Sequence, residues 1–317
     1  MSERPISFSL TQLEYFVAVA ETGNISAAAA RLHASQSALS SALLRLERHL
    51  GTQLLIRHHA RGVTLTPHGE ELLAQARDLL TQARRLEQTA VDLQGGVRGF
   101  LSAGCFRTMA PTVIPQVLRT LRREYPELEL DVAELDTPEI EQRLRDGSIE
   151  LAICYRMGLG EETDYREVTT WPQYALVSPT SLLADRGTVS LAELNTVPLV
   201  VQKLAQVRER TLATLASAGQ VPSRVIEAAS YETMRGLVSA GEGFALLYQR
   251  VAMPHTYDGG EVVTLELSDP LTPTSVGIAT ARGARMTERA RVFAAAAERV
   301  LRASAHAGPA QPPGGSS

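Results

Sequence analysis

Side chains that can hydrogen-bond or carry positive charge gather on one face of the stretch 24–50, NISAAAARLHASQSALSSALLRLERHL. They recur around one side of a helix that is predicted to begin at residue 36: Gln36, Ser37, Ser40, Ser41, Arg45 and Arg48. Ser35 suits the N-cap, and the free amides of the first turn suit a phosphate. Such a face can enter a major groove or can simply be solvated, and this segment alone does not decide between the two.

The apolar residues of this stretch position that face. Leu39, Ala42, Leu43, Leu46 and Leu50 recur at steps of three and four, the spacing of a buried helical stripe. An alanine-rich helix is expected after Ser26, small enough to cross close to its neighbours. The helix before it is expected to begin at TQLE, where Thr11 and Glu14 have capping-box spacing, and to stop at Gly23. This order is typical of a helix-turn-helix.

A small hairpin is predicted next, because two short apolar pieces, QLLI and VTLT, flank RHHARG. Its arginines Arg57 and Arg61 would extend toward a nucleic-acid backbone or a narrow minor groove. Residues 31–61 hold five arginines and one acid, Glu47, a local formal charge of +4, whereas the whole chain carries -4. The basic charge is therefore local, and only charges that face phosphates contribute to binding.

Composition narrows the class of protein. A chain of 317 residues with 44% hydrophobic residues is long enough for two or three globular domains. It has no signal-peptide pattern and no run long enough to span a bilayer, so a cytoplasmic protein without a membrane partner is expected. Cys105 and Cys154 form neither a metal cluster nor a disulfide framework, which favours buried thiols. Without a phosphate loop, nucleophile elbow or metal-ligand spacing, we expect no enzyme and no cofactor.

A long helix is predicted from Pro67. Its apolar residues keep a seven-residue repeat for three heptads: Leu72, Ala76, Leu79, Ala83, Leu86, Ala90 and Leu93. This repeat predicts a coiled-coil seam with a second copy of the chain. A helix that packs on its own domain is the alternative.

After Gly95 and Gly96 the pattern becomes βαβαβ, with strands at FLSAGC, ELELDVAEL and ELAICY. A second α/β lobe is expected from Trp171 to about Leu265, followed by a strand and a helix that return to the first lobe. Two crossing segments make a hinge, and the cleft between lobes is where a small molecule would bind.

The chain as a whole resembles the LysR-type transcriptional regulators, from Leu10 to about Leu301. The resemblance is carried by LEYFVAVAETGNISAAAARLHASQSALSSALLRLERHLGTQLLIR, TPHGEEL, YPELELDVAEL, LRDGSIELAI and LVSAGEGFALL. It implies an α/β multidomain fold: an N-terminal winged helix-turn-helix (1–66), a long dimerising linker helix (67–96), a two-lobed periplasmic-binding-protein-like α/β effector domain (97–302) and a disordered tail (303–317). Lobe I is expected at about 97–170 and 266–302, and lobe II at about 171–265.

The resemblance also implies the DNA contacts. Gln36, Ser37, Ser40 and Ser41 match the family's groove-facing positions, Arg45 lies on the same face, and Arg57 and Arg61 fall on its wing. Ser41 stands where many relatives carry a longer side chain, so discrimination is expected to shift to Gln36 and the wing. The wing is one residue longer than in some relatives.

For the effector, the family's cleft corresponds here to strand ends and to the loops that follow them. The expected contacts are Phe106, Arg107, Thr108, Thr137, Gln202, Lys203 and Tyr231. Arg107 and Lys203, the only lysine of the chain, can receive a carboxylate, which favours an anionic effector. A loop that simply carries exposed polar residues is the alternative for these two cations.

The implied partners are double-stranded DNA with an interrupted inverted repeat, a small-molecule effector, a second copy in a homodimer or homotetramer, and RNA polymerase. Two other functions stay open. One is a two-lobed solute-binding protein, although the helix-turn-helix fused to the two lobes argues against it. The other is a redox-responsive regulator that uses Cys105 and Cys154, although the family's peroxide sensors carry their cysteine pair in the second lobe, around LVVQKLAQVR, which has none.

Overall fold

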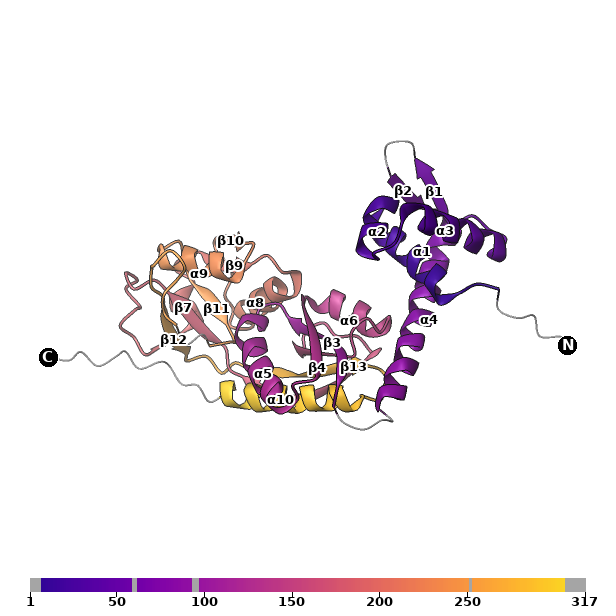
Figure 1. Ribbon diagram of the computed structural model, residues 1–317. Coiled ribbons are helices and arrows are strands. Elements are labelled where there is room, and N and C mark those ends of the chain that lie inside the picture. Colours follow the sequence, from indigo (N-terminus) through magenta and orange to yellow (C-terminus); the bar gives the residue numbers. More distant parts are fainter. Residues whose placement is uncertain (1–6, 59–61, 93–96, 251–252, 306–317) are drawn as a thin grey trace. The chain divides into compact units, whose positions relative to one another are not determined.

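The chain forms two compact units in the computed structural model, which describes residues 7–58, 62–92, 97–250 and 253–305. One unit consists of residues 1–96 together with 146–148, and the other of residues 97–145 and 149–317 (Figure 1). Among the described residues, no helix is both long enough and apolar enough to cross a membrane.

The first unit is a helix-turn-helix with a β-hairpin and a long helix. Its elements are α1 (Leu10–Thr22), α2 (Ile25–Arg31), α3 (Gln36–Leu50), β1 (Leu55–His58), β2 (Gly62–Leu65) and α4 (Pro67–Asp92). The predicted apolar stripe of α3 is confirmed, because Leu39, Ala42, Leu43 and Leu46 are buried in the core of this unit. β1 and β2 pair as an antiparallel hairpin, which confirms the wing.

The first helix begins earlier than its sequence pattern predicted. Ser9, not Thr11, is the N-cap: its hydroxyl accepts from the Gln12 backbone amide at 3.3 Å, and the Gln12 side chain accepts from the Ser9 amide at 2.8 Å. The pair Ser9 and Gln12 therefore forms the capping box that was assigned to Thr11 and Glu14, and that assignment is wrong.

The helix α4 divides its apolar residues between two environments. Ala76 and Leu80 are buried against α1 and its neighbours, so this part packs on its own unit, as the alternative interpretation held. Leu79 is 38% exposed and Leu86 is 72% exposed. Leu93, the last position of the heptad repeat, lies outside the described residues.

The first lobe of the second unit is a five-stranded sheet in the order β4-β3-β5-β13-β6. Its strands are β3 (Gly99–Phe106), β4 (Leu128–Leu135), β5 (Leu151–Tyr155), β6 (Thr163–Trp171) and β13 (Thr274–Ala281). β3 pairs in parallel with β4 and with β5, as the βαβαβ pattern predicted. β13 pairs antiparallel with both β5 and β6, and the strand β6 was not predicted.

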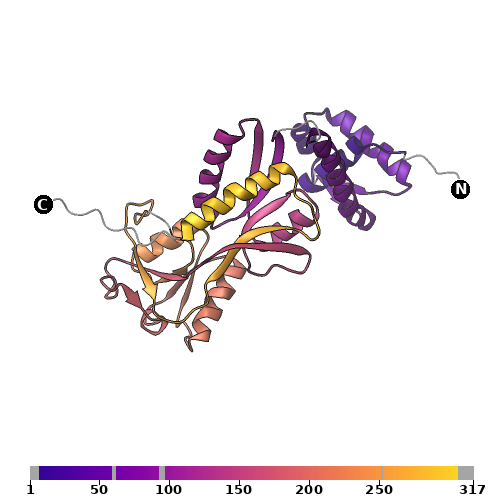
Figure 2. The same cartoon turned by 90° about the horizontal axis from the view of Figure 1, so that it is seen from below.

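Three helices cover this sheet: α5 (Ala110–Glu124), α6 (Thr137–Arg145) and α10 (Glu288–Ala305). The chain crosses from β3 to β4 in one direction and from β4 to β5 in the other, so right-handed crossovers place α5 and α6 on opposite faces. α10 packs beside α5, and Figure 2 shows it lying lengthwise along the lobe.

The second lobe contains two small sheets. Its elements are β7 (Tyr174–Val177), β8 (Thr188–Val189), α7 (Leu191–Leu194), β9 (Leu199–Gln202), α8 (Ala205–Ser217), β10 (Val225–Ala228), α9 (Tyr231–Ser239), β11 (Ala245–Leu247) and β12 (Val263–Leu267). β10 pairs in parallel with β9, and the other sheet has the order β11-β7-β12-β8. A bridge between Leu199 and Phe244 connects the two sheets. The chain passes between lobes at residues 172–173 and again at residues 268–273.

Candidate nucleic-acid interface and interlobe cavity

The polar face of α3 is open to solvent. Gln36, Ser37, Ser41 and Arg45 are exposed and Ser40 is half-buried, while the opposite face lies in the core. Ser35 is the N-cap, as predicted, and its hydroxyl accepts from the Ala38 amide at 3.2 Å. The helix can therefore present amide, hydroxyl and guanidinium groups to a partner without losing any core packing.

Short caps fix the helix that precedes α3. The Asn24 side chain accepts from the amides of Ser26 and Ala27 at 2.8 and 3.1 Å, which starts α2. In the turn between α2 and α3, His33 has a φ of 50°, a left-handed conformation that non-glycine residues seldom adopt. Nothing in the sequence pattern pointed to this backbone conformation at His33.

The wing is anchored to the helices by hydrogen bonds from three backbone amides. One carboxylate oxygen of Glu47, on α3, accepts from the amides of Leu54 and Leu55 at 2.8 and 3.1 Å. On the other strand, the Val63 amide donates to the Gly23 carbonyl at 2.7 Å. In the sequence, Glu47 stands out only as the single acid of a basic segment. Its anchoring role depends on its contact with the Leu54 and Leu55 amides, which residue spacing does not indicate.

Some arginines of this unit form ion pairs, whereas others are exposed without one in the described part of the chain. Arg31 pairs with Glu21 at 2.9 Å, and Glu21 also pairs with Arg77 of α4 at 3.1 Å. Within the described part of the chain, no ion pair involves Arg45 or Arg57, and both are exposed. Arg61 of the predicted wing set lies outside the described residues. The charge available to a phosphate backbone therefore includes Arg45 on the helix and Arg57 on the wing.

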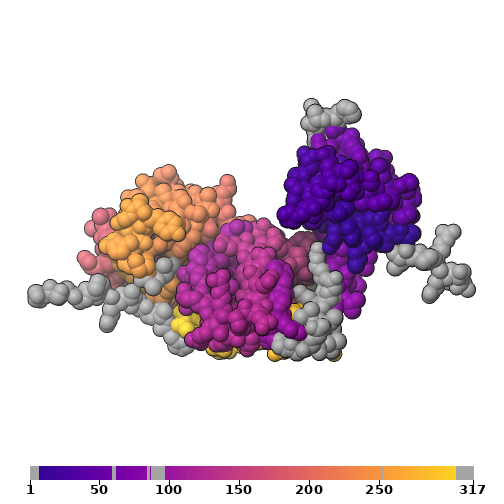
Figure 3. Space-filling model, in the orientation of Figure 1, coloured from indigo at the N-terminus to yellow at the C-terminus, as the bar shows by residue number. Residues whose placement is uncertain are grey.

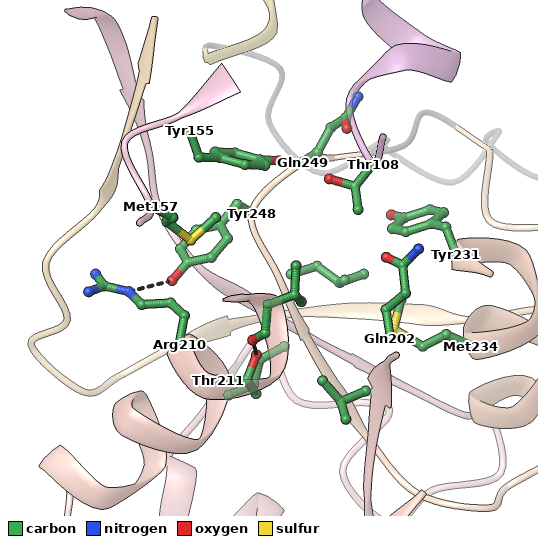
Figure 4. Close-up of a pocket in the computed structure, with 14 residues that line it drawn as sticks. Thr108, Tyr155, Met157, Gln202, Arg210, Thr211, Tyr231, Met234, Tyr248 and Gln249 are labelled. Carbon is green, nitrogen blue, oxygen red and sulfur yellow. Dashed lines mark hydrogen bonds between the residues drawn. The ribbon is translucent and has the colours of Figure 1, made fainter. Parts of the chain in front are cut away.

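A cavity lies between the two lobes of the second unit (Figure 4). The first lobe contributes the ends of β3 and β5, and the second lobe contributes β9, α8, α9, β11 and the segment after β11. Its lining residues are Thr108, Tyr155, Met157, Val201, Gln202, Val207, Arg210, Thr211, Tyr231, Met234, Leu246, Leu247, Tyr248 and Gln249. The cavity has a volume of about 30 Å³, which is room for about two water molecules. On the face that Figure 3 shows, the two lobes touch.

Three of the seven predicted effector residues line this cavity: Thr108, Gln202 and Tyr231. The other four are placed elsewhere, as their contacts show. Phe106 is fully buried against the Tyr155 ring, and Arg107 forms an ion pair with Glu139 at 2.9 Å. The Thr137 hydroxyl donates to the Met157 carbonyl at 3.0 Å. Lys203 is exposed to solvent.

The lining residues that sequence reasoning missed are mainly aromatic and amide side chains. Tyr155 closes β5, and Tyr248 and Gln249 follow β11, so all three lie at strand ends, where ligands bind in sheets of this kind. The ring of Tyr155 contacts those of Phe106, Trp171 and Tyr248 at centroid distances of 5.3, 5.9 and 5.9 Å. Burial raises the pKa of Tyr155, so its hydroxyl stays protonated.

The two cysteines lie in the core of the first lobe. In the parallel register of β3 and β5, Cys105 is opposite Ile153, so the Cys105 and Cys154 side chains point to opposite faces of the sheet. Both are buried and unpaired. Burial raises the pKa of Cys105 and raises the pKa of Cys154 to about 12, so both thiols stay protonated and unreactive near neutral pH.

Comparisons with known proteins agree with this architecture. Residues 10–70 match the model of the bacterial regulatory helix-turn-helix proteins of the lysR family, and residues 94–302 match the LysR substrate binding domain. A probable hydrogen peroxide-inducible genes activator from Streptomyces viridosporus is 32% identical over 307 residues, which cover 95% of this chain and 97% of that protein.

Solved structures give the same result. A putative LysR family transcriptional regulator from Pseudomonas aeruginosa aligns over 93% of this chain and all of its own, with 29% identity and a TM-score of 0.63. A mutant OxyR from Corynebacterium glutamicum, with hydrogen peroxide bound, aligns over 96% of both chains with 28% identity and a TM-score of 0.60. The chain therefore belongs to the LysR family and is a transcriptional regulator that joins a DNA-binding helix-turn-helix to an effector-binding domain.

Proposed function

We propose that the exposed face of α3 and the wing form one DNA-reading surface. Gln36, Ser37, Ser40 and Ser41 reach base edges and nearby phosphates in the major groove, because amide and hydroxyl groups can both donate and accept there. Arg45 and Arg57 contact the backbone or the adjacent minor groove. For Arg61, the proposal rests on the sequence alone.

The observation that carries this proposal is the anchoring of the wing to the helices. Because Glu47 holds β1 to α3, and the Gly23 carbonyl holds β2, the polar face of α3 and Arg57 belong to one rigid body. A surface with fixed geometry can meet a groove and its flanking phosphates together, and it loses little conformational entropy on binding.

We also infer that the regulator binds DNA as a homodimer that pairs through α4. Its exposed Leu79 and Leu86 would otherwise face water. Leu79 also borders an apolar hollow of about 270 Å³ beside Phe16 and Leu46, which side chains of a second copy can fill. Two reading heads favour an interrupted inverted repeat as the binding site.

The interlobe cavity is the proposed effector site, with Thr108, Gln202 and Tyr231 among its contacts. A bound effector would favour one arrangement of the lobes over another, and that difference in affinity is what can change the DNA-bound state. Contact with RNA polymerase would follow if the regulator activates transcription. A regulator of this kind acts at the chromosome, which supports the cytoplasm as its location.

Sensing of peroxide by thiols, suggested by the names of several relatives, has little support in this chain. Its two cysteines are buried on opposite faces of one sheet in the first lobe, and the second lobe contains none. Their raised pKa values also oppose formation of the thiolate, which is the form of cysteine that attacks peroxide. We therefore favour ligand binding over thiol oxidation as the regulatory event.

The DNA-reading surface can be tested by a mobility-shift titration on the intergenic fragment beside the protein's own gene. The double substitution Gln36→Ala with Ser40→Ala should weaken binding by about fivefold to 150-fold, the result of losing about 1–3 kcal/mol of base contact. The matched control is Gln116→Ala with Ser217→Ala, two exposed helical residues of the effector unit, which should bind as the parent does. Unchanged affinity in the first double variant would refute the assignment of α3.

A further inference from the structure

The interlobe cavity has an uncharged interior. Among the described lining residues, Arg210 is the one charged side chain, and it is exposed, with its Nε donating to the Tyr248 hydroxyl at 3.4 Å. Figure 4 shows this contact at the edge of the cluster of side chains. The two cations expected to bind a carboxylate, Arg107 and Lys203, do not line the cavity.

Two buried polar atoms in this lining have no hydrogen-bond partner among the described residues: the Tyr231 hydroxyl and Gln249 Oε1. The Tyr174 hydroxyl beside Tyr231 donates its proton to the Gln249 backbone carbonyl at 2.7 Å, so it has no proton to donate to the Tyr231 oxygen. A buried polar group without a partner costs free energy, so native structures seldom leave one without a reason. These two atoms point to a ligand that supplies what they lack.

The missing partners define the hydrogen-bonding groups of the ligand. Gln249 Oε1 can only accept, so the ligand must donate to it. The Tyr231 hydroxyl stays protonated because burial raises the pKa of Tyr231, so it can donate to the ligand or accept from it. A carboxylate fails the first condition, because it has no proton to donate to Gln249 Oε1. The one cation in the described lining, Arg210, lies at the exposed edge of the cavity, so a carboxylate placed beside Gln249 would bury its charge next to a carbonyl oxygen.

The rest of the wall favours a flat apolar body. Tyr155 and Tyr248 supply aromatic faces, and Met157 and Met234 supply flexible thioethers that can move to admit a ring. The present free space, about 30 Å³, is smaller than one ring needs, so entry requires these side chains or the lobes to shift. A single ring requires the smallest such shift, which favours a ligand with one ring.

We propose that the effector is an uncharged, single-ring aromatic molecule whose polar group both donates and accepts a hydrogen bond, as the primary amide of benzamide does. The proposal rests on the proposed function of the cavity as the effector site. It replaces the anionic effector that the sequence favoured.

Benzamide and benzoate provide a matched pair of probes, because they share size and shape while only benzoate is charged at neutral pH. Trp171, the single tryptophan of the chain, has its ring centroid 5.9 Å from that of Tyr155 in the cavity wall, so its fluorescence reports binding. Titrations of the full chain should show benzamide binding at least tenfold more tightly than benzoate. Calorimetry on the same samples detects binding that leaves the fluorescence unchanged.

Two tyrosine variants test the contact itself. Tyr231→Phe should weaken benzamide binding about threefold to tenfold, the loss expected for one neutral hydrogen bond, and should keep the melting temperature because the lost hydroxyl had no partner. Tyr257→Phe, at a side chain that is 93% exposed, should bind benzamide as the parent does.

Three results would overturn the proposal: benzoate binding as tightly as benzamide, no saturable binding of benzamide, or equal benzamide affinity in Tyr231→Phe and the parent. A mobility-shift assay on the same samples separates these failures from a failure of the regulator itself. If DNA is bound and no uncharged probe binds, only the effector class is wrong.

Discussion

Removing the carboxylate of Glu47 should weaken DNA binding, although charge alone predicts the opposite. Glu47→Ala deletes the only acid between residues 31 and 61 and would raise the local charge from +4 to +5. More positive charge near phosphates normally tightens binding. However, the same carboxylate holds the amides of Leu54 and Leu55 at the start of the wing.

The size of the effect follows from these two hydrogen bonds. A bond from an amide to a charged acceptor contributes about 1.5–3 kcal/mol, and Glu47 is half-buried, so solvent reduces its share. We expect Glu47→Ala to destabilise the wing by about 2–3 kcal/mol, and Glu47→Gln, which keeps an acceptor oxygen, by about 1 kcal/mol. Misplacement of the wing should then weaken DNA binding by about fivefold, or about 1 kcal/mol.

Hydrogen exchange gives a local readout of this effect. A loss of about 2 kcal/mol should speed exchange of the Leu54 and Leu55 amides about thirtyfold in Glu47→Ala, with a smaller change in Glu47→Gln. A mobility shift on the same proteins gives the DNA affinity. Unchanged protection together with equal or tighter DNA binding in Glu47→Ala would refute the anchoring role of Glu47.

Three other predictions follow from the same contacts. Gly62→Ala should lower the stability of the DNA-binding unit by about 2 kcal/mol or more, measured by thermal unfolding, because Gly62 has a φ of 85° and an added Cβ would collide with the Gly23 carbonyl. Leu86→Glu should raise the dimer dissociation constant in sedimentation, whereas Leu182→Glu, at a fully exposed site, should not. Cys154 should resist alkylation at pH 7, because burial keeps its thiol protonated. Its pKa is raised to about 12 in the folded state, so titration of Cys154 should leave the stability of the fold unchanged below about pH 9 and should lower it as the pH rises toward 12.

Much of the fold was predictable because apolar spacing is a local property. The stripe of α3, the wing and the strands β3, β4 and β5 all follow from periods of three to four or from short apolar runs. β6 was missed because Asp164, Arg166 and Glu167 break its apolar run, and it lies at the edge of the sheet, where such charges reach water. The antiparallel direction of β13 depends on a return from the second lobe, which no local pattern records.

Residues of the interlobe cavity could be predicted from the sequence only where the alternation of side chains along a strand decides which way they point. Gln202 ends β9 with its side chain buried toward the cavity, so Lys203, the next residue, points the other way into solvent. Arg107 was expected to face the cleft, but Glu139, 32 positions later, pairs with it. Tyr248 and Gln249 enter the cavity from a segment whose path depends on the packing of the whole second lobe, so the sequence did not identify them.

The central claim is that two copies of α3 and its wing read DNA together. Hydroxyl-radical footprinting on the intergenic DNA beside the gene tests it most directly. The account predicts two protected half-sites on one face of the duplex, with inverted symmetry and a whole number of helical turns between them, and both are lost in the Gln36→Ala, Ser40→Ala double variant. A single protected patch without symmetry, or protection that survives both substitutions, would contradict it.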